Sequence, residues 1–287
     1  RCEYRNRFTR TRAFEEEQVA GHALYGGLID RPGVSQRPGW GARGGLRDTS
    51  ATDVIVHAGM ALTTFYQCGE GYRLDPYTLE QGGTEGWVPE DGISAHAKVD
   101  EATGELMFFN YSKHAPYMHY GVVGPDNQLR HYVPIPLAGP RLPHDMAFTP
   151  NWSILNDMPL YWNAQLLERN LHVVNFHPDQ PTRFGLIPRY GQPEEIRWFE
   201  AAPTYVLHWL NAWEEGDEVV LDGYYQEEPM PKSYPNAPEG YERMMAYLDQ
   251  MLMKPKLHRW RFNLRTGQTL EEDLDDEVTE FPMVNGR

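Results

Sequence analysis

The sequence predicts an all-β protein, and within this class a β-propeller built from repeated antiparallel sheets. Phe, Trp and Tyr make up 13% of the 287 residues, which also include 26 Gly and 23 Pro. Such a composition favours strands that are joined by many turns. Apolar residues alternate with a short period along most of the chain, whereas apolar residues at helical spacing are rare.

The expected strands are short runs of alternating apolar and polar residues that are bounded by turn-forming residues. The segments that meet this description are Asp53–Ala58, Ala61–Gln67, Gly71–Leu74, Leu106–Tyr111, Tyr117–Val123, Leu129–Ile135, Met146–Phe148, Trp152–Asn156, Arg183–Pro188, Glu195–Phe199, Thr204–Ala212, Glu218–Tyr225 and Leu257–Asn263. We expect most of them to be joined by compact turns.

A turn-forming motif recurs between these strands. Leu74–Glu80, Val99–Leu106 and Phe262–Thr269 each combine Asp or Asn with Thr, and Val123–Leu129 is a looser copy. These residue types suit tight hairpins. The repetition favours a propeller, in which four-stranded blades recur every ~40–50 residues. A meandering β-sandwich is the alternative.

Helices are expected to be few and short, and to cap one face of the sheets together with the loops. Glu15–Leu24 is one candidate and Glu239–Met253 is a longer one. The longer segment has an apolar stripe at helical spacing, formed by Met244, Met245, Leu248, Met251 and Leu252. We interpret this stripe as packing on the sheet, with a membrane or a substrate tunnel as the alternative. The acidic run Glu271–Glu277 is interpreted as a solvated loop rather than a cation site.

Composition and charge exclude several classes of function. The net charge is −15, and an acidic chain repels phosphate backbones, so nucleic acid is not an expected partner. The two cysteines, Cys2 and Cys68, form neither a disulfide framework nor a CxxC pair. No apolar run approaches ~20 residues and no secretory signal is evident, so we expect a cytoplasmic protein with at most peripheral membrane contact.

Three of the eleven histidines, His96, His144 and His208, are candidate metal ligands. They lie 48 and 64 residues apart, which is close to one blade and to one blade plus a loop around Tyr161–Asp179. If each opens the innermost strand of its blade, all three face the propeller axis. Imidazole suits Fe, Zn, Cu and Ni. We interpret the other histidines as structural: His22, His57, His114, His119, His131, His172, His177 and His258.

The segments around these histidines resemble motifs of the carotenoid cleavage oxygenase family, which includes lignostilbene dioxygenases. Ser94–Asp100, followed by Thr103-Gly104-Glu105, resembles "AHPKxD…TGE", although Ala97 stands in place of the proline. His144–Thr149 resembles "HDFAxT", and His208–Gly216 resembles "HxxNAxEEG". Further matching blocks are Glu280–Pro282, Pro181–Arg189, Arg10–Phe14 and Leu74–Glu80.

The resemblance implies a seven-bladed propeller with one non-haem Fe(II) per chain on its axis. Four histidines hold the iron in this family, and His96, His144 and His208 match three of them. Carboxylates orient some of these imidazoles. Glu280 matches one such carboxylate, and Gln67 stands at the place of another. We expect residues 1–287 to form a single propeller domain that is truncated at both ends, with the fourth histidine beyond Arg287.

The implied reaction is oxidative scission of a conjugated C=C bond by O2, which gives two carbonyl products. No catalytic side chain is expected beyond the metal centre, because the iron activates O2 and an apolar tunnel positions the alkene. The expected partner is a hydrophobic conjugated small molecule, and we favour a carotenoid or apocarotenoid. Cleavage of a stilbene or phenylpropene, of the lignostilbene or isoeugenol type, is the alternative. A non-catalytic propeller that binds hydrophobic ligands is an alternative of another class.

The tunnel candidates are Tyr66, Phe148, Trp209 and Leu28. Leu28 and Tyr66 stand where stilbene-cleaving relatives carry a Tyr and a Lys that grip the phenol, and this difference is the reason for favouring carotenoids. Phe65, Trp152 and Trp162 are further aromatic candidates, and any aromatic residue in this set is also a candidate for plain core.

Overall fold

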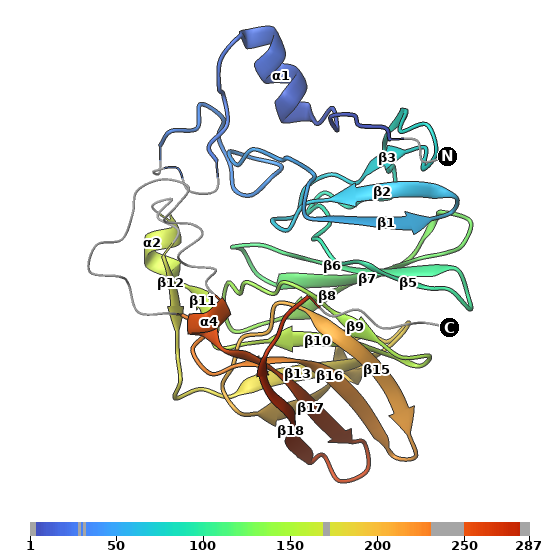
Figure 1. Cartoon of the computed structure of the whole chain (residues 1–287), viewed down its shortest axis with the longest axis vertical. Coiled ribbons are helices and arrows are strands. Elements are labelled where there is room, and N and C mark those ends of the chain that lie inside the picture. Colours follow the sequence, from blue (N-terminus) through green and yellow to red (C-terminus); the bar gives the residue numbers. More distant parts are fainter. Residues whose placement is uncertain (1–3, 28–29, 31–32, 169–172, 231–249, 282–287) are drawn as a thin grey trace. The chain divides into compact units, whose positions relative to one another are not determined.

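The computed structural model describes residues 4–27, 30, 33–168, 173–230 and 250–281. The chain divides into two compact units, Arg1–Pro136 and Leu137–Arg287. Antiparallel sheets dominate the described part of each unit, as the alternating apolar pattern predicts (Figure 1). Each unit is described by itself below.

A short helix, α1 (Arg12–Ala20), precedes the sheets of the first unit. Thr11 caps its N-terminus, because the Thr11 side chain accepts a hydrogen bond from the backbone N–H of Phe14. Gly21 ends the helix with a left-handed φ of 72°, which glycine adopts without strain. The helix predicted over Glu15–Leu24 is therefore present, but it begins earlier and ends at this glycine.

The first unit contains two four-stranded antiparallel sheets, each in plain chain order. The first sheet consists of β1 (Asp53–His57), β2 (Met60–Thr64), β3 (Tyr72–Leu74) and β4 (Gln81–Thr84). The second consists of β5 (Lys98–Asp100), β6 (Glu105–Tyr111), β7 (Tyr117–Val123) and β8 (Leu129–Pro136). Strand β1 lies beside β5, so the first strands of the two sheets are neighbours.

An apolar core holds these two sheets together. Leu62, Trp87, Ile93 and Phe108 are buried in it, and the rings of Trp87 and Phe108 lie 5.2 Å apart. Gly121 makes room for Phe108, because a Cβ at this glycine would lie 2.5 Å from two atoms of the Phe108 ring. The close approach explains a glycine in the middle of β7.

The second unit also contains two four-stranded antiparallel sheets. One consists of β9 (Ala147–Phe148), β10 (Trp152–Asp157), β13 (Thr182–Pro188) and β14 (Arg197–Ala201). The other consists of β15 (Trp209–Glu215), β16 (Glu218–Gln226), β17 (Pro255–Asn263) and β18 (Thr269–Val278). Strand β9 lies beside β15 and β14 lies beside β18, so corresponding strands of the two sheets face each other. This stacking is typical of propeller blades.

The core between these sheets is rich in aromatic rings. Phe184 contacts Trp209, Trp260 and Phe262, with ring centroids 5.0–5.7 Å apart. Trp209 in turn meets Trp260 edge-on at 5.6 Å. Tilted and edge-on contacts of this kind are the favoured geometries of aromatic pairs.

Several further elements differ from the expected ones. The expected loop around Tyr161–Asp179 carries a two-stranded sheet of β11 (Leu160–Trp162) and β12 (Val174–Phe176), with helix α2 (Ala164–Glu168) between them. Glu195, the first residue of the strand expected over Glu195–Phe199, instead belongs to a single 3-10 turn, η1 (Pro193–Glu195).

The strand expected over Thr204–Ala212 begins only at Trp209. The backbone N–H of Thr204 donates to Thr182 Oγ1 and that of Val206 donates to Met158 Sδ, so this buried stretch is satisfied by side chains rather than by a neighbouring strand. The short strands β4, β5, β11 and β12 were not predicted.

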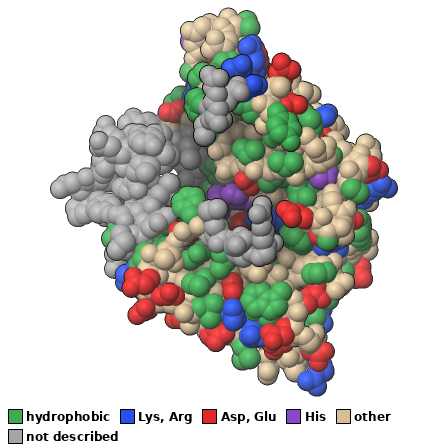
Figure 2. Space-filling view, turned by 45° about the vertical axis from the view of Figure 1, so that its right-hand side comes forward, with side chains coloured by type: hydrophobic (Ala, Val, Ile, Leu, Met, Phe, Trp, Pro, Cys, Tyr) green, Lys and Arg blue, Asp and Glu red, His purple; other side chains and the backbone are tan. Residues whose placement is uncertain are grey.

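The interpretation of Glu271–Glu277 as a loop is wrong, because this run lies within β18. Side chains on β17 pair with it: His258 Nδ1 lies 2.6 Å from Asp273 Oδ1, and the Arg259 guanidinium lies 3.8 Å from the Glu272 carboxylate. The run is exposed, as expected for acidic residues. Acidic side chains are scattered over the face seen in Figure 2, in keeping with the net charge of −15.

Most of the helix expected over Glu239–Met253 lies outside the described residues. Only its end is described, as α4 (Gln250–Met253). Within the described part of the chain, no helix is both long and apolar enough to cross a membrane. The four-stranded sheets agree with the expected blades, while the number of blades stays a prediction.

Candidate metal centre

The three candidate ligands occupy equivalent places in their sheets. His96 comes two residues before β5, His144 three residues before β9, and His208 directly before β15. Each therefore precedes the first strand of a four-stranded sheet, as the spacing of the histidines predicts. All three side chains are partly buried.

In the first unit, the backbone of His96 is strained. Its φ is +58°, a left-handed conformation that costs a non-glycine residue about 1–2 kcal/mol. Its neighbours Ala95 and Ala97 are buried, and their small side chains let the chain turn inside the protein. Strain of this kind concentrates at functional sites, where the surrounding structure holds it.

Asp53, the first residue of β1, holds the ring of His96. His96 Nδ1 lies 3.1 Å from Asp53 Oδ2, and the other carboxylate oxygen accepts the Val54 backbone N–H at 2.8 Å. Burial tends to raise the pKa of Asp53, but the hydrogen bond and the charge of His96 outweigh it, so this pKa is below its usual value. Because an ionised carboxylate can only accept, Nδ1 carries the proton and Nε2 is the nitrogen left to bind a metal.

In the second unit, the rings of His144 and His208 lie side by side, with centroids 5.2 Å apart and planes at 74°. The buried carboxylate of Asp145 joins the two segments that carry them. Asp145 Oδ1 accepts the backbone N–H of Met146 at 2.7 Å, and Oδ2 accepts that of Trp209 at 3.0 Å. One side chain therefore fixes the residue after each histidine.

Glu280, which the family resemblance implies behind one of the imidazoles, contacts His208. His208 Nδ1 lies 2.8 Å from Glu280 Oε2, and the Glu280 side chain is only 1% exposed. The ring of Phe281 stacks on His208 at 5.4 Å. Since the carboxylate accepts from Nδ1, the imidazole presents Nε2 for a ligand, which is the same arrangement as at His96.

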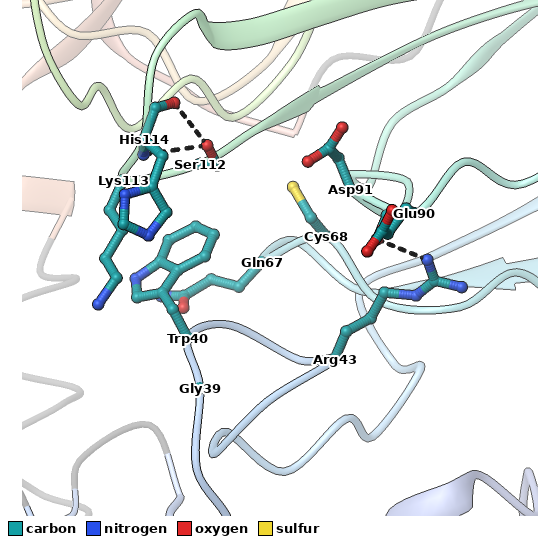
Figure 3. Close-up of a pocket in the computed structure, with 10 residues that line it drawn as sticks. All are labelled: Gly39, Trp40, Arg43, Gln67, Cys68, Glu90, Asp91, Ser112, Lys113 and His114. Atoms are coloured by element: carbon teal, nitrogen blue, oxygen red, sulfur yellow. Dashed lines mark hydrogen bonds between the residues drawn. The ribbon is translucent and has the colours of Figure 1, made fainter.

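Gln67, expected to face an imidazole, instead bonds Tyr66. Its Nε2 donates to the Tyr66 hydroxyl at 2.9 Å, and its buried Oε1 has no hydrogen-bond partner among the described residues. Gln67 also lines a pocket of about 340 Å³ in the first unit. Figure 3 shows it beside Trp40 on one side of this pocket, with Cys68 and Asp91 on the other.

The tunnel candidates have different surroundings. Burial raises the pKa of Tyr66, so its hydroxyl stays protonated. Phe148 is partly buried, with the Arg189 guanidinium 5.7 Å from its ring centre. Trp209 packs in the aromatic core described above, which favours a structural role. Leu28 lies outside the described residues.

Several of the remaining histidines have structural partners in their own units. His57 Nε2 bonds the backbone carbonyl of Gly104, His119 Nδ1 bonds Asn110, and His177 stacks on Tyr161. Burial lowers the pKa of His119. These contacts agree with the interpretation of these histidines as structural.

The donor set suits a transition-metal ion. Imidazole nitrogens are neutral ligands for Fe, Zn, Cu and Ni, and a carboxylate on the remote nitrogen fixes the tautomer that binds. His96 and His208 both have such a carboxylate. The residues therefore fit the Fe(II) that the family resemblance implies.

Antiparallel sheets, three of which have a histidine shortly before their first strand, define this chain as a β-protein with three candidate metal ligands. The family model described as retinal pigment epithelial membrane protein matches residues 1–287. The chain therefore belongs to this family, which is the carotenoid cleavage oxygenase family.

Two relatives illustrate the similarity. The chain is 36% identical to a carotenoid 9,10(9',10')-cleavage dioxygenase of Pisum sativum over 195 residues, 67% of this chain and 35% of the relative. It is 30% identical to isoeugenol monooxygenase of Pseudomonas putida over 294 aligned residues, 98% of this chain and 58% of the relative. The chain thus spans roughly a third to three fifths of these relatives.

Solved structures of the family share the fold. The cobalt-substituted apocarotenoid oxygenase of Synechocystis matches with a TM-score of 0.75 at 21% identity, over 96% of this chain and 59% of that one. The lignostilbene dioxygenase of Pseudomonas brassicacearum matches with a TM-score of 0.72 at 22% identity, over 93% and 55%.

Proposed function

We propose that this chain is part of a non-haem Fe(II) oxygenase that cleaves a conjugated C=C bond of a carotenoid-like or apocarotenoid-like substrate with O2. The observation that carries the proposal is the equivalent placement of His96, His144 and His208 before the first strands of their sheets. Family membership supports the same chemistry.

The proposed metal centre binds one Fe(II) per chain, with His96, His144 and His208 as three of its ligands. In this proposal the two units are parts of one seven-bladed propeller, and the three imidazoles meet on its axis. The cobalt-substituted relative supports a site that accepts divalent transition metals. The carboxylates of Asp53 and Glu280 hold two of the imidazoles so that Nε2 faces the metal.

In this proposal, the side chains of the protein orient the metal ligands and the substrate. Bound Fe(II) supplies the activation of O2. Asp145 keeps the backbone after His144 and the backbone after His208 in fixed register, so the ligand nitrogens are held before the metal arrives. Apolar side chains position the alkene, and no residue needs to act as a nucleophile or strong base.

Two observations bear on the substrate. The chain is 36% identical to a carotenoid 9,10(9',10')-cleavage dioxygenase over 67% of its length, whereas the match to isoeugenol monooxygenase extends over 98% of the chain at 30% identity. We favour the carotenoid substrate, because Tyr66 replaces the lysine that grips the phenol in stilbene-cleaving relatives. Phenylpropene or stilbene cleavage is the second candidate, which the extent of the isoeugenol match supports.

The decisive experiment offers the Fe(II)-loaded whole protein an apocarotenal, a hydroxystilbene and isoeugenol in parallel. We expect aldehyde products from the apocarotenal, and a His144→Ala variant without bound iron or turnover. His22→Ala is the matched control, because this exposed histidine bonds only locally to Ala20. Turnover of the phenolic substrates alone would overturn the carotenoid assignment. Hydrophobic ligand binding without iron or turnover would indicate a non-catalytic binding protein.

A further inference from the structure

We propose that Asp53 is a positioning residue that fixes the tautomer and the direction of the His96 imidazole at the metal centre. The inference rests on the proposed iron site. It adds a carboxylate that neither the sequence motifs nor the comparisons assign. Asp53 does not touch the metal or the substrate in this proposal, because it acts through the imidazole.

The carboxylate of Asp53 is itself fixed. Its Oδ1 accepts the Val54 backbone N–H at 2.8 Å, which leaves Oδ2 directed at His96 Nδ1, 3.1 Å away. Asp53 opens β1 and His96 precedes β5, and these two strands are neighbours. The hydrogen bond therefore joins the rigid starts of two sheets rather than two flexible loops.

The backbone of Tyr66 forms hydrogen bonds to the segment that carries Asp53 and to the segment that carries His96. Its N–H donates to Thr52 Oγ1 at 3.2 Å, next to Asp53. Its carbonyl oxygen accepts from Ser94 Oγ at 3.0 Å, two residues before His96, and from the Tyr111 hydroxyl at 2.6 Å. The segments that carry the carboxylate and the imidazole are thus both held to the backbone of one residue, Tyr66.

The strained backbone of His96 and its hydrogen bond to Asp53 together determine the orientation of the imidazole ring. A φ of +58° turns the side chain in a direction that the favoured backbone conformations do not provide. The Asp53 contact then selects one rotation of the ring and one protonated nitrogen. Without it, the imidazole could rotate or take the other tautomer, and Nε2 would no longer be held as the ligand.

Glu280 provides an internal parallel. It accepts from His208 Nδ1 at 2.8 Å, so two of the three candidate ligands have the same carboxylate arrangement. Gln67, at the place where the family resemblance implies a carboxylate, donates to Tyr66 instead. Asp53 therefore supplies a second carboxylate partner for the imidazoles, at a position that the motifs do not include.

The test compares Asp53→Ala and Asp53→Asn in the whole protein loaded with Fe(II) or with Co(II). The readouts are the rate of metal release to a chelator, the visible absorption of bound Co(II), and the thermal unfolding of the metal-free protein. Asp273→Asn is the matched control, because Asp273 pairs with His258 Nδ1 at 2.6 Å in a different sheet. Glu280→Gln and His96→Ala are the reference variants.

We expect Asp53→Ala to release metal 10–100-fold faster than the wild type, as for other residues that orient a metal ligand. Asp53→Asn keeps the shape and an acceptor oxygen but loses the charge, so we expect a smaller increase and a shifted Co(II) spectrum. Asp273→Asn should match the wild type in both readouts. If the alanine variant does not fold, the isosteric asparagine variant carries the test.

Two negative results have different meanings. Wild-type metal release and spectrum in the Asp53 variants, with metal loss in His96→Ala, would overturn the role of Asp53 and leave the metal centre intact. Wild-type metal retention in His96→Ala would instead overturn the ligand assignment and, with it, the proposed function.

Discussion

The carboxylate of Asp145 accepts the backbone N–H of Trp209 at 3.0 Å, and thereby ties the residue after His144 to the residue after His208. The side chain is 2% exposed, and its other oxygen accepts the N–H of Met146. A buried side chain thus sets the spacing of two candidate ligands that are far apart in the sequence.

Replacing Asp145 by Ala leaves two buried N–H groups without their acceptor. Each such group costs about 1–3 kcal/mol, so we expect the free energy of unfolding to fall by about 2–6 kcal/mol. Urea denaturation measures this loss. Asp179→Asn, at an exposed position of the same unit, should change it by less than about 0.5 kcal/mol. An unchanged midpoint in Asp145→Ala would contradict the bridging role.

Removing the Glu280 carboxylate that contacts His208 should reduce activity and metal affinity more than it reduces the stability of the fold. Glu280→Gln keeps the volume but loses the charged acceptor for Nδ1, so we expect a roughly 10–100-fold loss of kcat/KM or of metal affinity. Steady-state kinetics and metal titration of the whole protein measure both quantities. Wild-type values for both would show that the contact at 2.8 Å has no influence on the ligand.

Adding a methyl group at Gly121 should destabilise the first unit. The new Cβ would lie 2.5 Å from the buried Phe108 ring, and overpacking of this kind costs about 1–3 kcal/mol. The matched control is Gly86→Ala, because a Cβ at Gly86 would meet nothing within 4 Å. Equal unfolding free energies of the two variants would argue against the close packing of β7 on Phe108.

The carboxylate of Glu214 should give the second unit a pH-dependent stability. Burial tends to raise its pKa, but hydrogen bonds from Thr149 and Asn151 outweigh this, so its pKa lies below the ordinary value of 4.5. A lowered pKa in the folded state stabilises the fold above pH 4.5, and this contribution disappears as the pH falls through the folded-state value.

Comparing the wild type with Glu214→Gln isolates this effect. We expect the wild type to be the more stable protein at neutral pH, and the difference in unfolding free energy to shrink below about pH 4.5. Denaturant titrations at several pH values measure it. A difference that grows toward acid would reverse the assigned sign.

Much of the fold could be predicted from the sequence because long strands carry an alternating pattern. Segments such as Tyr117–Val123 and Leu129–Pro136 combine that pattern with a turn between them, and both form as expected. β18 could not be predicted, because its acidic side chains resemble a solvated loop. Its strand depends on pairing with β17, whose His258 and Arg259 contact Asp273 and Glu272.

The candidate site could be predicted as far as it is encoded locally. His96, His144 and His208 stand in recognisable short motifs, and Glu280 lies in another. Asp53 lies 43 residues before His96 in an ordinary strand. Its contact exists only because β1 lies beside β5, and pairing between sheets leaves no signature in a single sequence.

The row of carboxylates on β18 has a consequence for self-association. Among the described residues, β18 is the last strand of its sheet and pairs with β17 alone, so it is an edge strand of that sheet. Leu270 and Leu274 are exposed on this strand, and these apolar side chains alone would favour its association with a strand of another molecule. Two such edges would bring like charges together, since the strand also carries Glu271, Glu272, Asp273, Asp275, Asp276 and Glu277. Charge on an edge strand discourages sheet-to-sheet aggregation, so these residues disfavour edge-to-edge pairing of two β18 strands.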